Sequence, residues 1–125
     1  MKAKVTSYRA MQYEFPFTPP SLNTILAEHP LTRAKRKKRF IQDMTMEIRS
    51  QGTIEFSGQV RIIIDLCFTN KRRRDPDNYL KFVLDGLVKS GVILDDSKEI
   101  IPDPPDLKIY DCDPEEKMII KVEEI

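Results

Sequence analysis

The fold is decided by residues 59–99, which read QVRIIIDLCFTNKRRRDPDNYLKFVLDGLVKSGVILDDSKE. In the first ten residues an apolar side chain recurs at every second position, which is the period of a strand with one buried face. This apolar set comprises Val60, Ile62, Ile64, Leu66 and Phe68. We therefore predict a strand over 59–68 that runs directly into a cation-rich loop.

The residues after this loop predict a helix. Asp75 is a residue type that favours the N-cap, and Pro76 suits the first helical position, where its missing N–H is not needed. The apolar residues that follow have the spacing of one helix face, namely Leu80, Val83, Leu84 and Leu87. Gly91 then provides a C-terminal stop, because glycine readily adopts the left-handed conformation that ends helices.

The flanking segments complete a small domain. Their patterns predict a strand over 11–17, a loop over 18–30, a helix over 32–50 and two strands over 107–110 and 117–124. Thr32 is a candidate N-cap for the helix, and Gly52 a candidate stop. We expect a single α+β domain over 1–125, with a mixed β-sheet packed by two helices in the order β-α-β-α-β-β.

Composition excludes several classes of protein. The chain has 125 residues, 40% hydrophobic and 33% charged, which is typical of one globular domain rather than a disordered chain. No apolar run is long enough to span a bilayer, and the first residues lack the apolar core of a secretory signal. With four glycines and no phosphate-loop or dinucleotide-binding pattern, we expect no organic cofactor and no membrane partner.

The two cysteines, Cys67 and Cys112, have neither metal-ligand nor redox-motif spacing. Together with the missing signal, this indicates a cytoplasmic protein in a reducing compartment. We expect Cys67 to be a core residue of the 59–68 strand and Cys112 to be a loop residue without a special role.

The net charge of +1 conceals a strong asymmetry along the chain. Residues 1–94 carry a balance of +8, whereas residues 95–125 carry a balance of −7. The cations concentrate in two runs, 33–39 and 71–74, and runs of one sign are typical of surfaces that bind a polyanion. A solvated helix face is the simpler explanation for 33–39; it fits 71–74 less well, because those cations adjoin candidate metal ligands.

Four aspartates are candidates for phosphodiester chemistry: Asp75, Asp77, and the later pair Asp95 and Asp96. Phosphodiester hydrolysis at neutral pH needs an activated water and a counter-charge, and Mg²⁺ held by a few carboxylates supplies both. Asp75 and Asp77 can converge on one ion, because Asp75 lies outside the helix. Lys81, one turn after Asp77, can stabilise phosphate charge or orient the attacking water.

Each of these residues also has a purely structural interpretation. Asp75 can be a helix cap and nothing more, and the row Asp77–Lys81–Asp85 can be an exposed ion-pair ladder worth about 0.2–0.5 kcal/mol per pair. Asp95 and Asp96 can form a solvated turn. Co-occurrence favours the metal hypothesis, because the strand, the cation run and both carboxylate groups fall within one compact unit.

The stretch RRRDPDNYLKFVLDGLVKSGVILDDSKEI resembles the signature of the RusA family of Holliday-junction resolvases. That signature is an Arg-rich D-x-D-N element, a lysine one turn later, and an L-D-D element after a helix and a glycine. The segment FTPPSLNT resembles the family's P-P-S-x-N element, here with Ser21 and Asn23. The two motifs together span most of the domain, from Phe15 to Ile101.

This resemblance implies a homodimeric, Mg²⁺-dependent endonuclease (with Mn²⁺ as a substitute) that makes paired symmetric nicks in four-way junctions during DNA recombination and repair. It implies that Asp75, Asp77 and Asp96 bind the metal and act in catalysis, with Lys81 assisting. The choice of Asp96 over Asp95 rests on the resemblance alone. The candidate DNA-binding residues are Lys37, Lys38, Arg39, Lys71, Arg72, Arg73 and Arg74.

Two other functions share part of this evidence. A non-catalytic module that binds branched DNA would use the same cations, and only the intact carboxylate set argues against it. A phosphohydrolase acting on a small nucleotide would use the same carboxylates, but the chain lacks a glycine-rich phosphate cradle.

Overall fold

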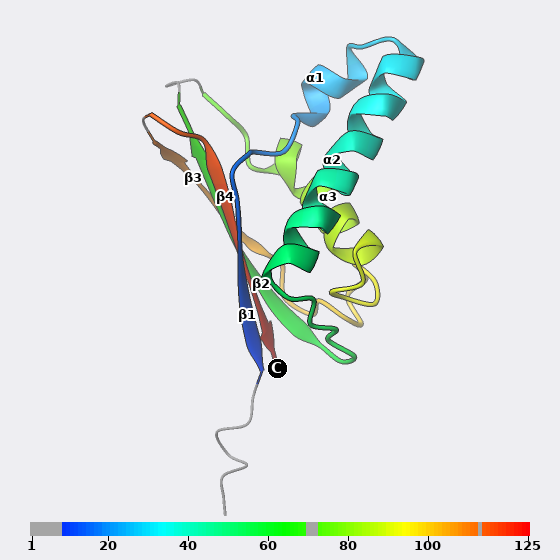
Figure 1. Cartoon of the computed structure of the whole chain (residues 1–125), viewed down its shortest axis with the longest axis vertical. Coiled ribbons are helices and arrows are strands. Elements are labelled where there is room, and N and C mark those ends of the chain that lie inside the picture. The colour runs from blue at the N-terminus through cyan, green and yellow to red at the C-terminus, as the bar shows by residue number, and fades with distance from the viewer. Residues whose placement is uncertain (1–8, 70–72, 113) are drawn as a thin grey trace, which may run out of the picture.

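The structure, a computed structural model, describes residues 9–69, 73–112 and 114–125. Its elements are β1 (Ala10–Phe15), α1 (Leu22–Leu26), α2 (Pro30–Gln51), β2 (Val60–Phe68), α3 (Asp77–Lys89), β3 (Asp106–Asp111) and β4 (Lys117–Glu124). The strands form one sheet and the helices cover one of its faces (Figure 1). The predicted α+β class is therefore confirmed. In the described ranges no helix combines the length and the apolar character that crossing a bilayer requires.

The sheet has the strand order β1-β4-β2-β3. β4 is antiparallel to both β1 and β2, whereas β2 and β3 are parallel. Parallel neighbours need a long crossover between them, and α3 lies within that connection. The mixed sheet expected from the sequence is thus present.

The core lies between the sheet and the helices. The predicted face of the 59–68 strand is buried throughout, from Val60 to Phe68, and it packs beside the alternating residues Met118, Ile120 and Val122 of β4. Met44 on α2 is also fully buried, at the point where α2 crosses α3. Gly86 allows this close crossing, because a Cβ there would collide with the Met44 thioether.

The C-terminal end of α3 follows the sequence prediction, whereas the helix begins one residue later than predicted, with Pro76 at the N-cap and Asp77 as the first helical residue. Pro76 already has helical backbone angles (φ −52°, ψ −35°), and the Asp75 side chain accepts a hydrogen bond from the Asp77 N–H at 3.2 Å. At the other end Gly91 has φ 84°. The N–H groups of Gly91 and of the next residue donate to the carbonyl oxygens of Val88 and Leu87, the pattern of a Schellman cap.

The N-terminal third differs from the prediction in two respects. The segment 18–30 is not a continuous loop, because it contains the short helix α1. The long helix starts at Pro30, so Thr32 is not its cap. His29 has that role, since its Nδ1 accepts a hydrogen bond from the Leu31 N–H at 3.2 Å and proline occupies the first helical position. The helical part of the domain therefore contains α1, which packs against α2 and α3, in addition to the two expected helices.

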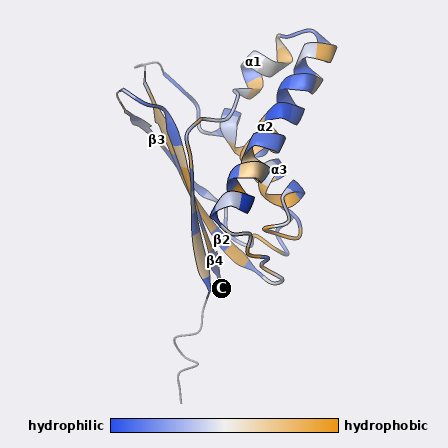
Figure 2. Ribbon diagram, in the orientation of Figure 1, coloured by the Kyte–Doolittle hydropathy of each residue, from blue (hydrophilic) through white to orange (hydrophobic). Residues whose placement is uncertain are grey.

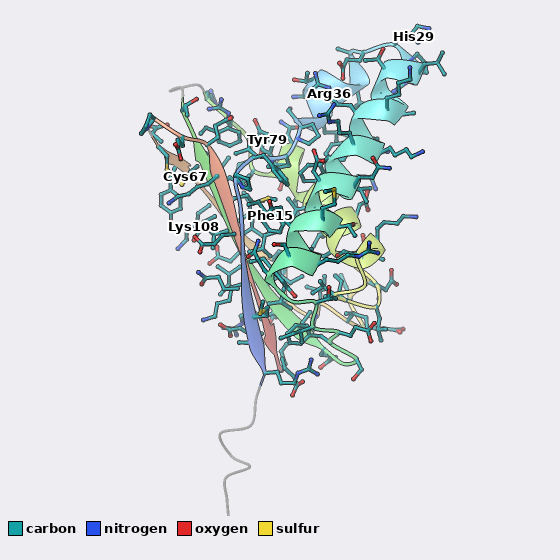
Figure 3. The ribbon with its side chains drawn as sticks, viewed as in Figure 1. Phe15, His29, Arg36, Cys67, Tyr79 and Lys108 are labelled. Atoms are coloured by element: carbon teal, nitrogen blue, oxygen red, sulfur yellow. A yellow bond between two sulfur atoms is a disulfide. The ribbon has the colours of Figure 1, made fainter. Side chains whose placement is uncertain are left out.

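The prediction for Cys67 is confirmed, and the prediction for Cys112 is wrong. Cys67 is buried as predicted, but Cys112 is its disulfide partner rather than a loop residue without a role. The physical reason is the parallel pairing of β2 and β3, which places Cys67 opposite Tyr110 and brings the residue after β3 beside the end of β2. The two Cα atoms are 5.1 Å apart, and the Cys112 N–H donates to the Phe68 carbonyl at 2.6 Å. Figure 3 labels Cys67 near this end of the sheet.

Tyr13 fastens β1 to the turn that follows α2. Its hydroxyl donates to the Gly52 carbonyl at 3.0 Å and accepts from the Ile54 N–H at 3.2 Å. Burial raises the pKa of Tyr13 above its ordinary value of 10.0, and the hydrogen bond from Ile54 opposes that rise. The same turn ends α2 at Gly52, as predicted.

Candidate active site

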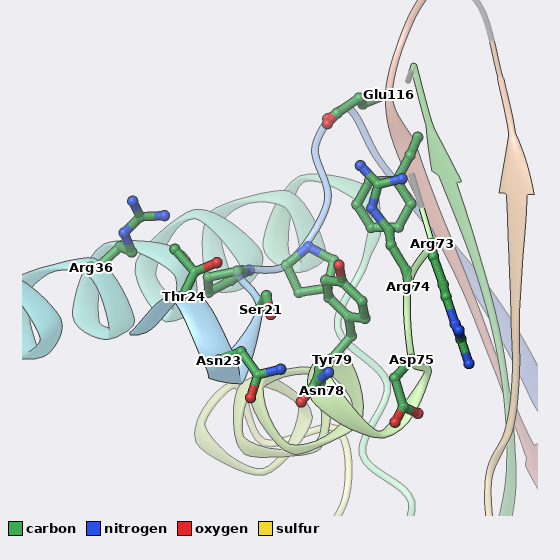
Figure 4. A pocket seen from close by; sticks show the side chains of 13 residues that line it. Ser21, Asn23, Thr24, Arg36, Arg73, Arg74, Asp75, Asn78, Tyr79 and Glu116 are labelled. Atoms are coloured by element: carbon green, nitrogen blue, oxygen red, sulfur yellow. The ribbon is translucent and has the colours of Figure 1, made fainter. Parts of the chain in front are cut away.

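A pocket of about 380 Å³ opens between the 19–24 segment and the residues that lead into α3 (Figure 4). Its lining combines prolines, carboxamides, cations and carboxylates, among them Pro19, Asn23, Arg36, Arg74, Asp75 and Asn78. These residues come from parts of the chain about 50 positions apart, and the packing of α1 against α3 brings them together. The P-P-S-x-N and D-x-D-N motifs therefore face one another across a single pocket.

Asp75 lies where this pocket meets a second hollow of about 580 Å³, which Arg73, Pro76 and both carboxamides, Asn23 and Asn78, also line. The Asp75 carboxylate is exposed and is oriented by its hydrogen bond from the N–H of the second residue after it. The capping role proposed for Asp75 is thus present. A carboxylate held in one orientation can also serve as a metal ligand, so the capping bond is compatible with both roles.

Two arginines bring positive charge to the same pocket. The Arg74 guanidinium lies 3.9 Å from the centroid of the Phe68 ring, and that ring packs against Tyr79 at 5.3 Å. Stacking on a buried ring restricts the rotamers of Arg74 and directs its charge toward the pocket. Arg73 is exposed. A phosphate beside Asp75 would therefore meet the positioned Arg74 and the adaptable Arg73, and Arg36 lines the same pocket.

Asp77 and Lys81 lie on a different side of α3. Both are exposed, and neither lines either of the two hollows around Asp75. Lys81 forms an ion pair with Asp85, at 3.8 Å, so half of the expected Asp77–Lys81–Asp85 row is present. Lys81 also lines a separate groove with Arg33 and Lys37 of α2.

Asp95 and Asp96 are exposed and follow the C-terminal end of α3. Asp77 begins that helix, whose 13 residues span about 18 Å at the usual helical rise. Figure 1 shows the following loop at the end of α3 away from the 73–76 segment. Within the described ranges no three histidine, cysteine, aspartate or glutamate side chains lie close enough to hold a metal ion. The structure therefore does not gather Asp75, Asp77 and Asp96 within one chain.

The chemistry of the donors near α3 nevertheless fits Mg²⁺. The ion prefers oxygen ligands, and it is commonly bound by one or two carboxylates, with waters and substrate phosphate completing its shell. Asp75 and Asp77 provide two carboxylates at the N-terminal end of α3, beside Arg73 and Arg74. This pair suits an ion that is bound together with a phosphodiester.

The chain was also compared with known proteins. The model of the family described as endodeoxyribonuclease RusA matches residues 16–121. The chain belongs to the RusA endodeoxyribonuclease family. The comparison with individual curated proteins gives no match. Family membership implies the nuclease activity of a Holliday-junction resolvase, and it confirms the resemblance found in the sequence motifs.

The remaining predicted DNA-binding residues of this RusA-family chain are spread over two regions. Lys71 and Arg72 lie outside the described residues. On α2, Lys38 is exposed, Arg39 is exposed and 3.9 Å from Asp43, and Lys37 is half-buried with its ammonium 5.7 Å from the centre of the Phe82 ring.

Several polar residues that line the pocket of this RusA-family chain were not among the predicted site residues, and they include Asn23, Arg36 and Glu116. The P-P-S-x-N motif contained a signal for Asn23, and the cation run contained one for Arg36, which also pairs with Glu28 at 3.0 Å. Nothing in the sequence pointed to Glu116. It reaches the pocket because β4 lies next to β2, and it accepts a hydrogen bond from the Thr18 hydroxyl at 3.2 Å.

Proposed function

We propose that this RusA-family chain is a magnesium-dependent endonuclease that resolves four-way DNA junctions by paired symmetric nicks, and so acts in DNA recombination and repair. One observation carries the proposal. Asp75, Arg73 and Arg74 line one pocket, and Asp77, two residues after Asp75, begins α3 beside it, so carboxylates and cations stand together at the N-terminal end of this helix. Hydrolysis of a phosphodiester needs both kinds of charge at one place.

In this proposal Asp75 and Asp77 hold Mg²⁺, for which Mn²⁺ can substitute. When bound, the ion supplies an activated water and neutralises charge on the phosphate. Arg74 is held against the Phe68 ring and contacts the phosphate to be cleaved. Arg73 contacts the same strand, and the positive end of the α3 dipole adds to the attraction for an anion.

The third carboxylate, Asp96, comes from a second copy of the chain. This assignment is supported by the placement of the carboxylates, because Asp77 begins α3, Asp96 follows its far end, and the described residues of one chain bring no three acidic, histidine or cysteine side chains together. A two-fold axis that sets two α3 helices antiparallel places the C-terminal end of one beside the N-terminal end of the other. Each site then has Asp75 and Asp77 from one protomer and Asp96 from its partner.

A homodimer also matches the symmetry of the substrate. A four-way junction has two-fold symmetry, and two symmetric cuts need two active sites related by the same axis. The cations Lys37, Lys38, Arg39, Lys71 and Arg72 contact the sugar-phosphate backbone of the junction arms. Backbone contacts hold the DNA without selecting a sequence, which suits recognition of a branched shape.

Cleavage of an end-labelled synthetic four-way junction tests this function. We expect symmetric nicks with Mg²⁺, none in excess chelator, and none in a linear duplex of the same sequence. Asp77→Asn is expected to fold and bind the junction but not to cut it. Asp103→Asn is the matched control, because it removes an exposed carboxylate that lines neither hollow around Asp75.

A module that binds branched DNA without cutting it is the second candidate. It is favoured by one observation, that no closed acidic cluster exists within the described part of a single chain. The same assay separates the two functions. Tight junction binding without nicks in Mg²⁺ or Mn²⁺ supports the binding module and contradicts the nuclease proposal.

A further inference from the structure

The N-terminal part of α2 forms an arm that the core does not need. The buried residues of α2 are Phe40, Met44 and Ile48, and none precedes them in the helix. Figure 2 shows this arm as mostly hydrophilic, and Figure 3 shows His29 at its tip, away from the sheet. An arm of nearly three turns with no buried residue requires an explanation other than packing.

The buried stripe of α2 continues into the arm as cations. Positions 48, 44 and 40 form the stripe, and the same spacing leads to Lys37 and then to Arg33. A helix packed only for stability would carry apolar residues at these two positions. In the described part of the chain neither cation forms an ion pair with a carboxylate. Both are only half exposed, so each lacks a counter-charge in partly desolvated surroundings.

These two cations line a groove of about 400 Å³ between the arm, α1 and α3. Lys81 of α3 lines the groove from the opposite side, and Leu22, Leu26 and Phe82 provide its apolar floor. No carboxylate is among the lining residues in the described part of the chain. Three cations from two helices therefore line one groove, an arrangement that suits an anion.

We propose that this groove binds one backbone phosphate of the cleaved DNA strand, next to the phosphate at which the strand is cut. The proposal rests on the proposed function and gives the lysine-rich arm a specific role in it. Lys81 lies one helical turn from Asp77 on the same face of α3, about 6 Å along the axis. This separation between Lys81 and Asp77 is comparable to the distance between successive phosphates in a DNA strand. The groove therefore holds one phosphate of the strand while Asp75 and Asp77 act on the next one. Lys81 is then a phosphate-binding residue, and when DNA binds, its ion pair with Asp85 is replaced by a contact with the phosphate.

An acidic protein segment is the competing occupant, because Leu26 is 58% exposed and Leu31, at the start of the arm, is 69% exposed. Two features favour DNA. The groove lies on the same face of α3 as Asp77, and the exposed cations Lys38 and Arg39 continue the positive charge along the arm. A strand that leaves the groove along α2 therefore remains beside cations.

Neutral methylphosphonates placed singly around the cleavage position of a four-way junction test the groove directly. In the wild-type protein, one or two of these substitutions should weaken binding. Lys37→Gln should bind more weakly, show a salt slope smaller by about 0.9, and be insensitive to those same substitutions. Lys37→Arg should keep the wild-type profile. Lys35→Gln is the matched control, since it removes an exposed charge two residues away on the same helix.

An unchanged methylphosphonate profile and salt slope in Lys37→Gln, with unchanged thermal unfolding, would overturn the groove proposal. A Lys37-dependent affinity for a synthetic peptide rich in Asp and Leu, together with that unchanged profile, would assign the groove to a protein partner instead. The nuclease function and the phosphate-binding groove can be disproved separately. If the wild-type protein cuts junctions and Lys37→Gln keeps the wild-type methylphosphonate profile, only the groove proposal is wrong. If the wild-type protein binds no DNA, both the groove proposal and the nuclease proposal are wrong.

Discussion

The Asp75 carboxylate accepts a hydrogen bond from the Asp77 N–H at 3.2 Å, so one candidate metal ligand fixes the start of the helix that carries the other. Asn caps helices about as well as Asp, whereas Ala does not. Asp75→Asn should therefore keep near-normal stability but lose cleavage, and Asp75→Ala should lose cleavage and also about 1 kcal/mol of stability. Chemical denaturation and junction cleavage measure the two effects. An active Asp75→Asn protein would show that Asp75 is only a cap.

Arg73 is exposed beside Asp75, where a backbone phosphate would replace its bound counterions. Arg73→Ala should weaken junction binding and reduce the slope of log affinity against log salt by about 0.9. Arg61→Ala is the matched control, because Arg61 is exposed on the sheet face away from the helices. Equal slopes for the wild type and Arg73→Ala, measured by titration at several salt concentrations, would exclude Arg73 from the DNA contact.

The shared site predicts complementation between two inactive variants. In a mixed dimer of Asp77→Asn and Asp96→Asn, one site has both substitutions and the other has neither. Mixing the two variants under conditions that exchange subunits should restore roughly a quarter of the wild-type nicking. Asp95→Asn is expected to be active alone. If each site were built within one chain, the mixture would remain inactive.

The central β-α-β segment was predictable because its local signals agree. The alternation of the 59–68 strand, the Asp75 cap and the Gly91 stop each depend on near neighbours in sequence, and all three appear in the structure. The N-terminal third was less predictable. His29 is an unusual cap, and α1 is too short for its periodicity to stand out.

The candidate site was predictable in composition but not in arrangement. The motifs identified Asp75, Asn78 and the arginines, yet the convergence of α1 on α3 that places Asn23 beside them is a tertiary contact. Asp77 begins α3 and Asp96 follows its far end, so the helix separates the two carboxylates. The apolar stripe that predicts this helix carries no information about which surface would pair with a second copy of the chain.

The Cys67–Cys112 bond closes a loop of 45 residues that includes the Arg-rich segment and α3. Closing a loop of that length stabilises a protein by about 2–4 kcal/mol, mainly by restricting the unfolded chain. Under oxidising conditions, thermal unfolding should therefore occur at a higher temperature than in dithiothreitol, and the difference should vanish in Cys112→Ser. Mass spectrometry without reduction should find the linked peptides. Two alkylatable thiols in the oxidised, folded protein would contradict the bond.

Tyr13 makes stability depend on pH in the alkaline range. Its pKa is raised by burial, so the folded state retains the phenol proton where the unfolded chain has lost it. The contribution of Tyr13 to stability is therefore fully present and independent of pH below about 10, and it decreases as the pH rises further. Tyr13→Phe should remove that part of the pH dependence and lower stability by about 1–2 kcal/mol at neutral pH, because the Gly52 carbonyl and the Ile54 N–H lose their partner. If the free energy of unfolding, measured in urea, falls equally with alkaline pH in the wild type and in Tyr13→Phe, Tyr13 does not have this role.

Cleavage of a supercoiled plasmid that extrudes a cruciform distinguishes paired from single nicks in one experiment, and so tests whether this protein resolves four-way junctions. A cruciform is a four-way junction that collapses once one strand is cut and the superhelical tension is lost. Paired symmetric nicking by a dimer must therefore convert the supercoiled plasmid to linear DNA in the presence of Mg²⁺, with no product from Asp77→Asn. Nicked circles alone would contradict paired cutting, and an unchanged plasmid in the presence of Mg²⁺ would contradict the nuclease.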